Sequence, residues 1–280
     1  MTRGFRRGDL SGEVGFAILL RTADGLQLRA EHLRYAPRDG VVGDPGLGIV
    51  LAHGFTGALD KPTFRAIATQ LSAYGGVVSF DFRGHGASGG ASTVGDAEVL
   101  DVDAAVAATR EYGYQRVVTV GFSMGGAVAI RQAALRGVRT FSPPDGVVTL
   151  SAVSRWYRVD TGPMRRLHWA VMTRSGRAFA RRLLGTRIAA DGWSPAPTPP
   201  DEIVGRVAPI PLLLIHGDQD PYLTMDNADD LYAAAREPVT LWVWPGFGHA
   251  ESGMSADRVD ELGPALIVLG RGVRVPNRVT

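Results

Sequence analysis

The sequence contains no cysteine, which excludes disulfide bonds, thiolate nucleophiles and metal sites built on cysteine. It also has almost no lysine: Lys61 is the only one, so nearly all of the positive charge comes from arginine. The net charge is only +2 at pH 7, and this balance does not favour a nucleic-acid binder.

No stretch approaches the roughly 20 apolar residues that span a bilayer. The N-terminus carries Arg3, Arg6 and Arg7, as a signal peptide does, but the apolar run at 14–20 is interrupted by Gly15 and lacks a cleavage pattern after it. We therefore expect no secretory signal and a cytoplasmic location.

The 280 residues are 45% hydrophobic and 21% charged, as in a globular protein with a sizeable core. Short runs rich in Val and Ile alternate with longer amphipathic stretches, which favours an α/β fold with a mainly parallel sheet. A hairpin is predicted within 14–28, turning at Asp24 and Gly25. Six buried strands are predicted at 48–52, 77–80, 117–120, 147–150, 212–215 and 239–243, and helices at 63–74, 97–112, 124–135 and 255–268.

The alternation of apolar runs and amphipathic stretches is interrupted between residues 154 and 206. No buried strand is apparent there, and amphipathic stretches run from Met164 to Leu184. A connection this long inside a compact domain is usually functional. We predict a helical cap at 154–206, inserted between two strands of a core formed by 1–153 and 207–280.

The strongest chemical signal is the run GFSMGG at residues 121–126, which follows an apolar strand and opens a helix. This is the context in which G-x-S-x-G forms a sharp turn that exposes a nucleophilic serine, here Ser123. The helix N-terminus would place the Met124 amide near a developing oxyanion. The alternative is a glycine-rich turn with an N-capping serine.

The run HGFTG at 53–57 follows another apolar strand, so the Phe55 amide is expected to complete an oxyanion hole with Met124, while His53 itself is expected to be structural. After later strands come Asp220, with Asp218 as a second candidate acid, and then His249. One known class of catalytic triads has its residues in the chain order serine, aspartate, histidine. The carboxyl ends of parallel strands lie at one edge of the sheet, so these three residues are expected to lie close together.

These segments, together with DFRGHGAS at 81–88, resemble the α/β-hydrolase superfamily, in the branch of monoglyceride lipases, esterases and serine-aminopeptidase-like hydrolases. The resemblance covers roughly residues 45–265 except the cap. It implies an α/β-hydrolase fold with a mostly parallel, twisted sheet of eight strands flanked by helices. It also places the acid on Asp220, and it implies that His85 and His216 are structural.

The implied activity is hydrolysis of a small-molecule carboxylic ester, with lipophilic and acylglycerol-like esters among the candidates, by Ser123, His249 and Asp220 through an acyl-enzyme. No metal or organic cofactor is needed. The same triad could serve an amide, thioester or C–C bond hydrolase or an acyltransferase, and a non-catalytic ligand-binding protein is a further alternative.

The segment from 154 to 187 carries nine arginines against one acid, Asp160. A solvated helix face explains this most simply, whereas contact with an anionic membrane surface or attraction of an acidic substrate are sharper hypotheses. Outside the motifs, His32 is expected at the surface of a strand and His168 in the cap. Oligomeric state is left open.

Overall fold

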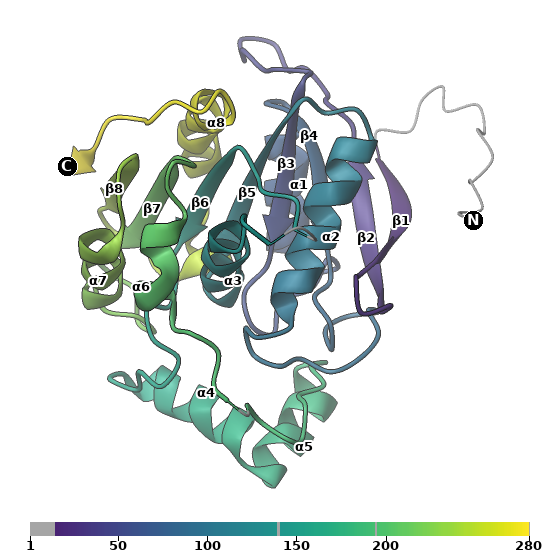
Figure 1. Ribbon diagram of the computed structural model, residues 1–280, viewed down its shortest axis with the longest axis vertical. Helices are drawn as coiled ribbons and strands as arrows, with labels where there is room; N and C mark the ends of the chain where they lie inside the picture. Colours follow the sequence, from purple (N-terminus) through teal and green to yellow (C-terminus); the bar gives the residue numbers. More distant parts are fainter. Residues whose placement is uncertain (1–14, 139–140, 194, 280) are drawn as a thin grey trace.

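The computed structural model describes residues 15–138, 141–193 and 195–279. The arginines at positions 3, 6 and 7 lie outside these residues. Nine strands form one sheet in the order β1-β2-β4-β3-β5-β6-β7-β8-β9 (Figure 1). The strands are β1 (Gly15–Arg21), β2 (Gln27–Leu33), β3 (Leu47–Ala52), β4 (Gly76–Phe80), β5 (Arg116–Phe122), β6 (Gly146–Leu150), β7 (Leu212–Gly217), β8 (Val239–Trp244) and β9 (Arg278–Val279).

The sheet is parallel from β4 to β9, and only β1 and β2 run antiparallel to their neighbours. Its central strands are buried along their length except at Arg116, the first residue of β5, which is why their sequences are predominantly apolar. All eight predicted strands are present. The hairpin turns at Gly25, which has a φ of 84°, and its second strand extends beyond the predicted limit to Leu33.

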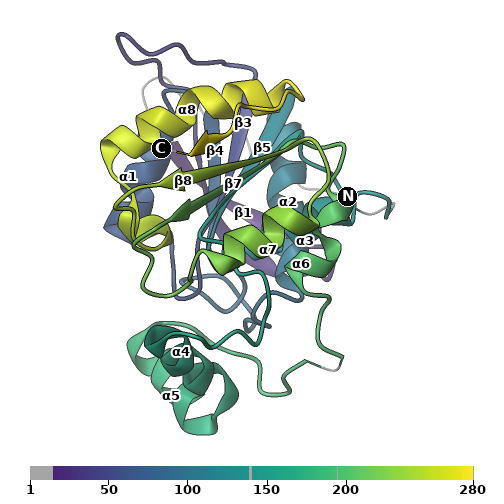
Figure 2. The same ribbon diagram turned by 90° about the vertical axis from the view of Figure 1, so that its left-hand side faces the viewer.

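Two layers of helices cover the sheet (Figures 1 and 2). One face carries α1 (Pro62–Leu71) and α8 (Ala256–Gly270), and the other carries α2 (Glu98–Glu111), α3 (Met124–Ala134), α6 (Pro200–Ile203) with the 3₁₀ turn η1 (Val204–Arg206), and α7 (Asp226–Ala234). The apolar sides of these helices pack on the sheet and form a core on each face. The predicted α/β-hydrolase fold class is thus confirmed in its sheet and its flanking helices.

The chain between β6 and β7 forms α4 (Gly162–Met172) and α5 (Arg174–Leu183), which pack on each other beyond one edge of the sheet (Figure 2). Thr173 separates them because its hydroxyl accepts a hydrogen bond from the Gly176 amide and so caps α5. Arg187 closes this segment against the core: its amide donates to the Gly84 carbonyl, and its carbonyl accepts from the Ser92 amide, both at 2.7 Å. None of the helices in the described residues is long and apolar enough to cross a membrane.

Candidate active site

Ser123 occupies the single position between the end of β5 and the start of α3. Its φ of 50° and ψ of −114° make it one of few non-glycine residues with a positive φ, so the turn from strand to helix is strained and sharp. The turn also needs small neighbours. A β-carbon at Gly121 would overlap the Gly125 carbonyl, and one at Gly125 would lie 2.5 Å from the carbonyl oxygen of Ala52. The local sequence therefore permits the serine to project from the tip of the turn.

Ser123, His249 and Asp220 meet although they lie far apart in the sequence. The Ser123 hydroxyl lies 3.1 Å from His249 Nε2, and His249 Nδ1 lies 2.8 Å from Asp220 Oδ2. With a carboxylate facing Nδ1, that nitrogen carries the proton, so Nε2 is free to accept the hydroxyl hydrogen. The structure therefore brings all three predicted triad residues into hydrogen-bonding distance.

The side chain of Asp220 is fully buried, and groups besides the histidine hold it. Its Oδ1 accepts hydrogen bonds from the amides of Tyr222 and Leu223, at 2.8 and 3.0 Å. Burial disfavours the charge, but the hydrogen bonds from His249 and from the Leu223 amide help to outweigh it and keep the Asp220 pKa below its ordinary value. The second candidate, Asp218, instead accepts from the Gly246 amide at 2.7 Å.

The amides predicted to bind an oxyanion are those of Phe55 and Met124, and both residues line the cavity at Ser123. Met124 is the first residue of α3, so its N–H has no acceptor within the helix. Neighbouring amides are already used: that of Ser123 donates to the Leu150 carbonyl at 2.9 Å, and that of Gly54 donates to Glu251 at 2.6 Å. Within the described residues, neither the Phe55 nor the Met124 amide donates to another group.

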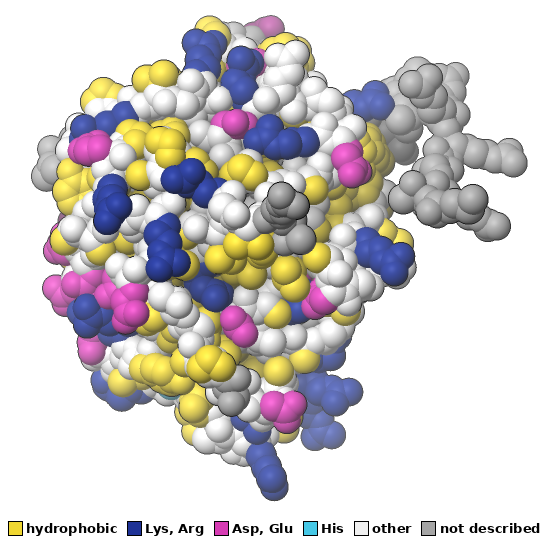
Figure 3. Space-filling model, in the orientation of Figure 1, with side chains coloured by type: hydrophobic (Ala, Val, Ile, Leu, Met, Phe, Trp, Pro, Cys, Tyr) yellow, Lys and Arg dark blue, Asp and Glu magenta, His cyan; other side chains and the backbone are white. Residues whose placement is uncertain are grey.

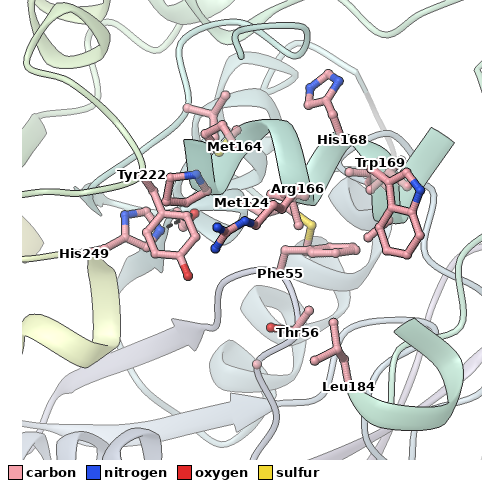
Figure 4. Close-up of a pocket in the computed structure, with 18 of the residues that line it drawn as sticks. Phe55, Thr56, Met124, Met164, Arg166, His168, Trp169, Leu184, Tyr222 and His249 are labelled. Atoms are coloured by element: carbon pink, nitrogen blue, oxygen red, sulfur yellow. Dashed lines mark hydrogen bonds between the residues drawn. The ribbon is translucent and has the colours of Figure 1, made fainter. Parts of the chain in front are cut away.

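A cavity of about 710 Å³ opens above Ser123 and His249 (Figure 4). The core contributes Phe55 and Met124 to its wall, while α4 contributes Met164, Leu167 and Trp169. The lining is thus predominantly apolar, as in sites for organic ligands, with a few polar groups near the serine. Within the described residues, no group of three or more His, Cys, Asp or Glu side chains is arranged to hold a metal ion.

Residues 49–262, more than half of the chain, match the model of the alpha/beta hydrolase family. The chain belongs to that family. The resemblance inferred from the motifs is therefore confirmed at the level of the superfamily. One relative of this alpha/beta hydrolase is the uncharacterized protein YfhR of Escherichia coli O157:H7, which is 26% identical over 250 residues, covering 80% of this chain and 74% of the relative.

Two solved structures illustrate the shared fold. The Pyrococcus furiosus esterase Pf2001 has a TM-score of 0.66 and 23% identity, with 95% of each chain covered. XC6422 of Xanthomonas campestris, described as an α/β serine hydrolase without lid, has a TM-score of 0.61 and 18% identity, with 93% of this chain and 96% of that chain covered. At these identities the likeness concerns the fold.

Glu251 is a residue of this alpha/beta hydrolase site that the sequence did not reveal. It lies in the 3₁₀ turn η2 (Ala250–Gly253), two positions after His249, and its Oε1 accepts the hydrogen bond from the Gly54 amide. Burial raises the pKa of its carboxyl, although the Gly54 amide partly offsets the effect. Its position two residues after the histidine is the only sequence signal, and nothing in the sequence connects it with Gly54.

The remaining histidines of the alpha/beta hydrolase core lie away from the serine hydroxyl. His53 is completely buried, accepts at Nε2 from the Phe82 amide at 3.0 Å, and has its pKa lowered to about 3 by burial. His216 Nε2 lies 2.9 Å from the Leu223 carbonyl. The expectation that His32 is a surface residue is wrong: it is only 4% exposed, because the rings of Tyr112 and Tyr114 cover it.

Proposed function

We propose that this alpha/beta hydrolase is a serine hydrolase that cleaves carboxylic esters of small organic molecules through an acyl-enzyme. One observation carries the proposal: the His249 ring lies between the Ser123 hydroxyl, at 3.1 Å, and the Asp220 carboxylate, at 2.8 Å. A serine is a weak nucleophile by itself, and this arrangement gives it a base whose orientation is fixed by a third group.

In the first step, Ser123 Oγ attacks the ester carbonyl carbon while His249 Nε2 takes the hydroxyl proton. The Asp220 carboxylate stabilises the imidazolium that forms and holds the ring in place. Negative charge develops on the carbonyl oxygen, and the Phe55 and Met124 amides are proposed to bind it. Each such donor lowers the barrier by about 3 kcal/mol.

Collapse of the tetrahedral intermediate breaks the bond to the leaving alcohol, which receives the proton from His249. A water molecule then attacks the acyl-enzyme, with His249 again taking the proton, and the acid is released as Ser123 is restored. These proposed reaction steps require no metal or organic cofactor. The half-buried Ser123 remains reachable from the cavity, as the second step needs.

The apolar lining supports lipophilic esters, with acylglycerols as one class. We further propose that residues 154–206 form a cap whose α4 and α5 shape the site, since both helices contribute side chains to the cavity. Amide, thioester and C–C bond cleavage and acyl transfer use the same triad, and binding without catalysis is the remaining alternative. The cytoplasmic location stays a prediction.

The proposal is tested with a fluorophosphonate probe and p-nitrophenyl esters of graded acyl length. We expect covalent labelling and ester turnover in the wild type, with both reduced to background in Ser123→Ala. Ser175→Ala, an exposed serine of α5, is the matched control and should behave as the wild type. If the wild type is neither labelled nor active, a binding protein is favoured. If it is labelled but cleaves no ester, amides, thioesters and C–C bonds are the substrates to test next.

A further inference from the structure

Few charged side chains line the cavity. Among the described residues that line it, the charged ones besides the histidines are Lys61, Arg166 and Glu251. The carboxyl of Glu251 already accepts the hydrogen bond from the Gly54 amide at 2.6 Å, and burial raises its pKa. The two cations therefore dominate the charge that a bound molecule meets in an otherwise apolar cavity.

Arg166 extends from α4 into this cavity. Figure 4 shows its guanidinium on the side of the cavity where Tyr222 and His249 lie. Within the part of the chain that the structure describes, this guanidinium forms no hydrogen bond and no ion pair. An arginine at this place presents several N–H donors in a planar fork to whatever enters the site.

Several other arginines of the same segment have partners, and none of the segment's other arginines lines this cavity. Arg165, the preceding residue, donates to the carbonyls of Val159 and Asp160 and does not line the cavity. Arg158 pairs with both Asp160 and Asp230 at 2.8 Å. What distinguishes Arg166 is therefore its place: it is the one arginine of the segment that lines the cavity, and its donors are available there.

We propose that the substrate carries an anionic oxygen group, a carboxylate or a phosphate, and that Arg166 binds this group while Ser123 attacks the ester. The inference rests on the proposed function and narrows its substrate class. A carboxylate or phosphate matches the guanidinium fork by two parallel hydrogen bonds. Lys61, which is exposed at the N-terminal end of α1, adds positive charge to the same cavity.

The two sources of the anion differ in the part of the substrate that carries it. Mono-p-nitrophenyl glutarate carries a carboxylate on the acyl side, and p-nitrophenyl pentanoate is its neutral counterpart of equal chain length. A monoacylglycerol phosphate carries a phosphate on the alcohol side, and the monoacylglycerol with the same short acyl chain is its neutral counterpart. Both pairs are used as soluble monomers, so that no lipid surface contributes.

The experiment compares kcat/KM for the anionic and neutral member of each pair in the wild type, Arg166→Met and Arg165→Met. In at least one pair, Arg166→Met should lower the anionic-to-neutral ratio about tenfold, because one charge-assisted pairing is lost. Arg165→Met removes the same charge from the neighbouring position and should leave the ratio at its wild-type value. Since Arg166 is exposed, the wild-type preference should also weaken as salt is raised.

An equilibrium measurement keeps this inference separate from the proposed function. Calorimetric binding of mono-p-nitrophenyl glutarate and of the acylglycerol phosphate is measured on Ser123→Ala with and without Arg166→Met, which requires no turnover. Unchanged ratios in both pairs, together with unchanged binding, overturn the role of Arg166 while Ser123-dependent ester cleavage still stands. A ratio that falls equally in Arg165→Met also overturns it, because the effect would then be one of net charge.

Discussion

The Gly54 amide donates a hydrogen bond to the Glu251 carboxyl over 2.6 Å and so joins two loops that are 197 positions apart in the sequence. Gly54 precedes Phe55, whose amide is a proposed oxyanion donor, and Glu251 follows His249 by two residues. One carboxyl thus connects the loop that would bind the oxyanion with the turn that carries the general base. Glu251 is therefore a positioning residue in our interpretation.

We predict that Glu251→Ala lowers kcat by roughly tenfold to a hundredfold, since small displacements of a donor loop cost this much. KM should change less than kcat, because Glu251 is one of many residues that line the cavity and its carboxyl is engaged by the Gly54 amide. Glu251→Gln retains an oxygen that can accept from the Gly54 amide and should recover most of kcat. Steady-state kinetics of both variants, with circular dichroism to check the fold, test this; wild-type kcat in a folded Glu251→Ala protein would contradict it.

The two acids of the loop after β7 give a second prediction. Asp220→Asn should reduce kcat by roughly ten-thousand-fold, since an amide no longer stabilises the imidazolium or fixes the histidine tautomer. Asp218→Asn alters only the contact with the Gly246 amide at the surface and should stay within a few-fold of the wild type. The paired kinetics decide between the candidates, and a larger loss in Asp218→Asn would reverse the assignment.

The sequence predicted the strands well because a strand covered on both faces is almost entirely apolar, as at Gly48 to Ala52. The serine turn was predictable for a local reason, since Gly121 and Gly125 are needed where backbones approach closely. The choice between Asp218 and Asp220 depended on the path of one loop. That path is set by the hydrogen bonds that the Tyr222 and Leu223 amides donate to Asp220, which spacing does not encode.

Other features depend on contacts between distant segments. His32 was expected at the surface, but the side chains of Tyr112 and Tyr114 cover it. The strand β9 has two residues, too few for any periodicity to appear. The direction of Arg166 into the cavity follows from how α4 packs at the edge of the core, and the sequence revealed only that the segment is rich in arginine.

A third prediction concerns pH and stability. Burial lowers the pKa of His53 to about 3, whereas the unfolded chain takes up this proton near the ordinary value of 6.5. The unfolded state therefore binds more protons between these values, and the stabilisation present above pH 6.5 is progressively lost as the pH falls toward 3. Between pH 7 and 5 the loss should be about 2 kcal/mol.

His53→Gln removes this titration while keeping an acceptor for the Phe82 amide. Its free energy of unfolding, measured by urea denaturation, should therefore depend less on pH between 7 and 5 than that of the wild type. His32, with a pKa lowered to about 4 by burial, adds a slope of the same sign and is left unchanged in both proteins. Equal pH slopes in wild type and variant would show that His53 does not contribute.

A fourth prediction concerns an anionic membrane surface. α5 exposes Arg174, Arg181 and Arg182 together with Leu183, which is 70% exposed. Figure 3 shows basic side chains at this lower end of the molecule, as well as elsewhere on the same face. If the segment contacts membranes, vesicles containing anionic lipid should co-sediment the protein better than neutral vesicles. Each arginine near such a surface contributes about 1 kcal/mol, so replacing the three by glutamine should abolish the difference. Equal binding of the wild type to both kinds of vesicle would remove this hypothesis.

The last prediction concerns the turn that carries Ser123. Gly125→Ala places a methyl group 2.5 Å from the carbonyl oxygens of both Ala52 and His53, so β3 and the loop that follows it must move. We expect a loss of about 1–3 kcal/mol in the free energy of unfolding, as for overpacking elsewhere. Activity should fall further than stability implies, because the displaced loop carries the Phe55 amide. Gly137→Ala, where a β-carbon meets no atom of the described residues within 4 Å, is the matched control and should be tolerated in both assays. If Gly125→Ala kept wild-type activity, close approach of the two backbones would not be what the motif requires.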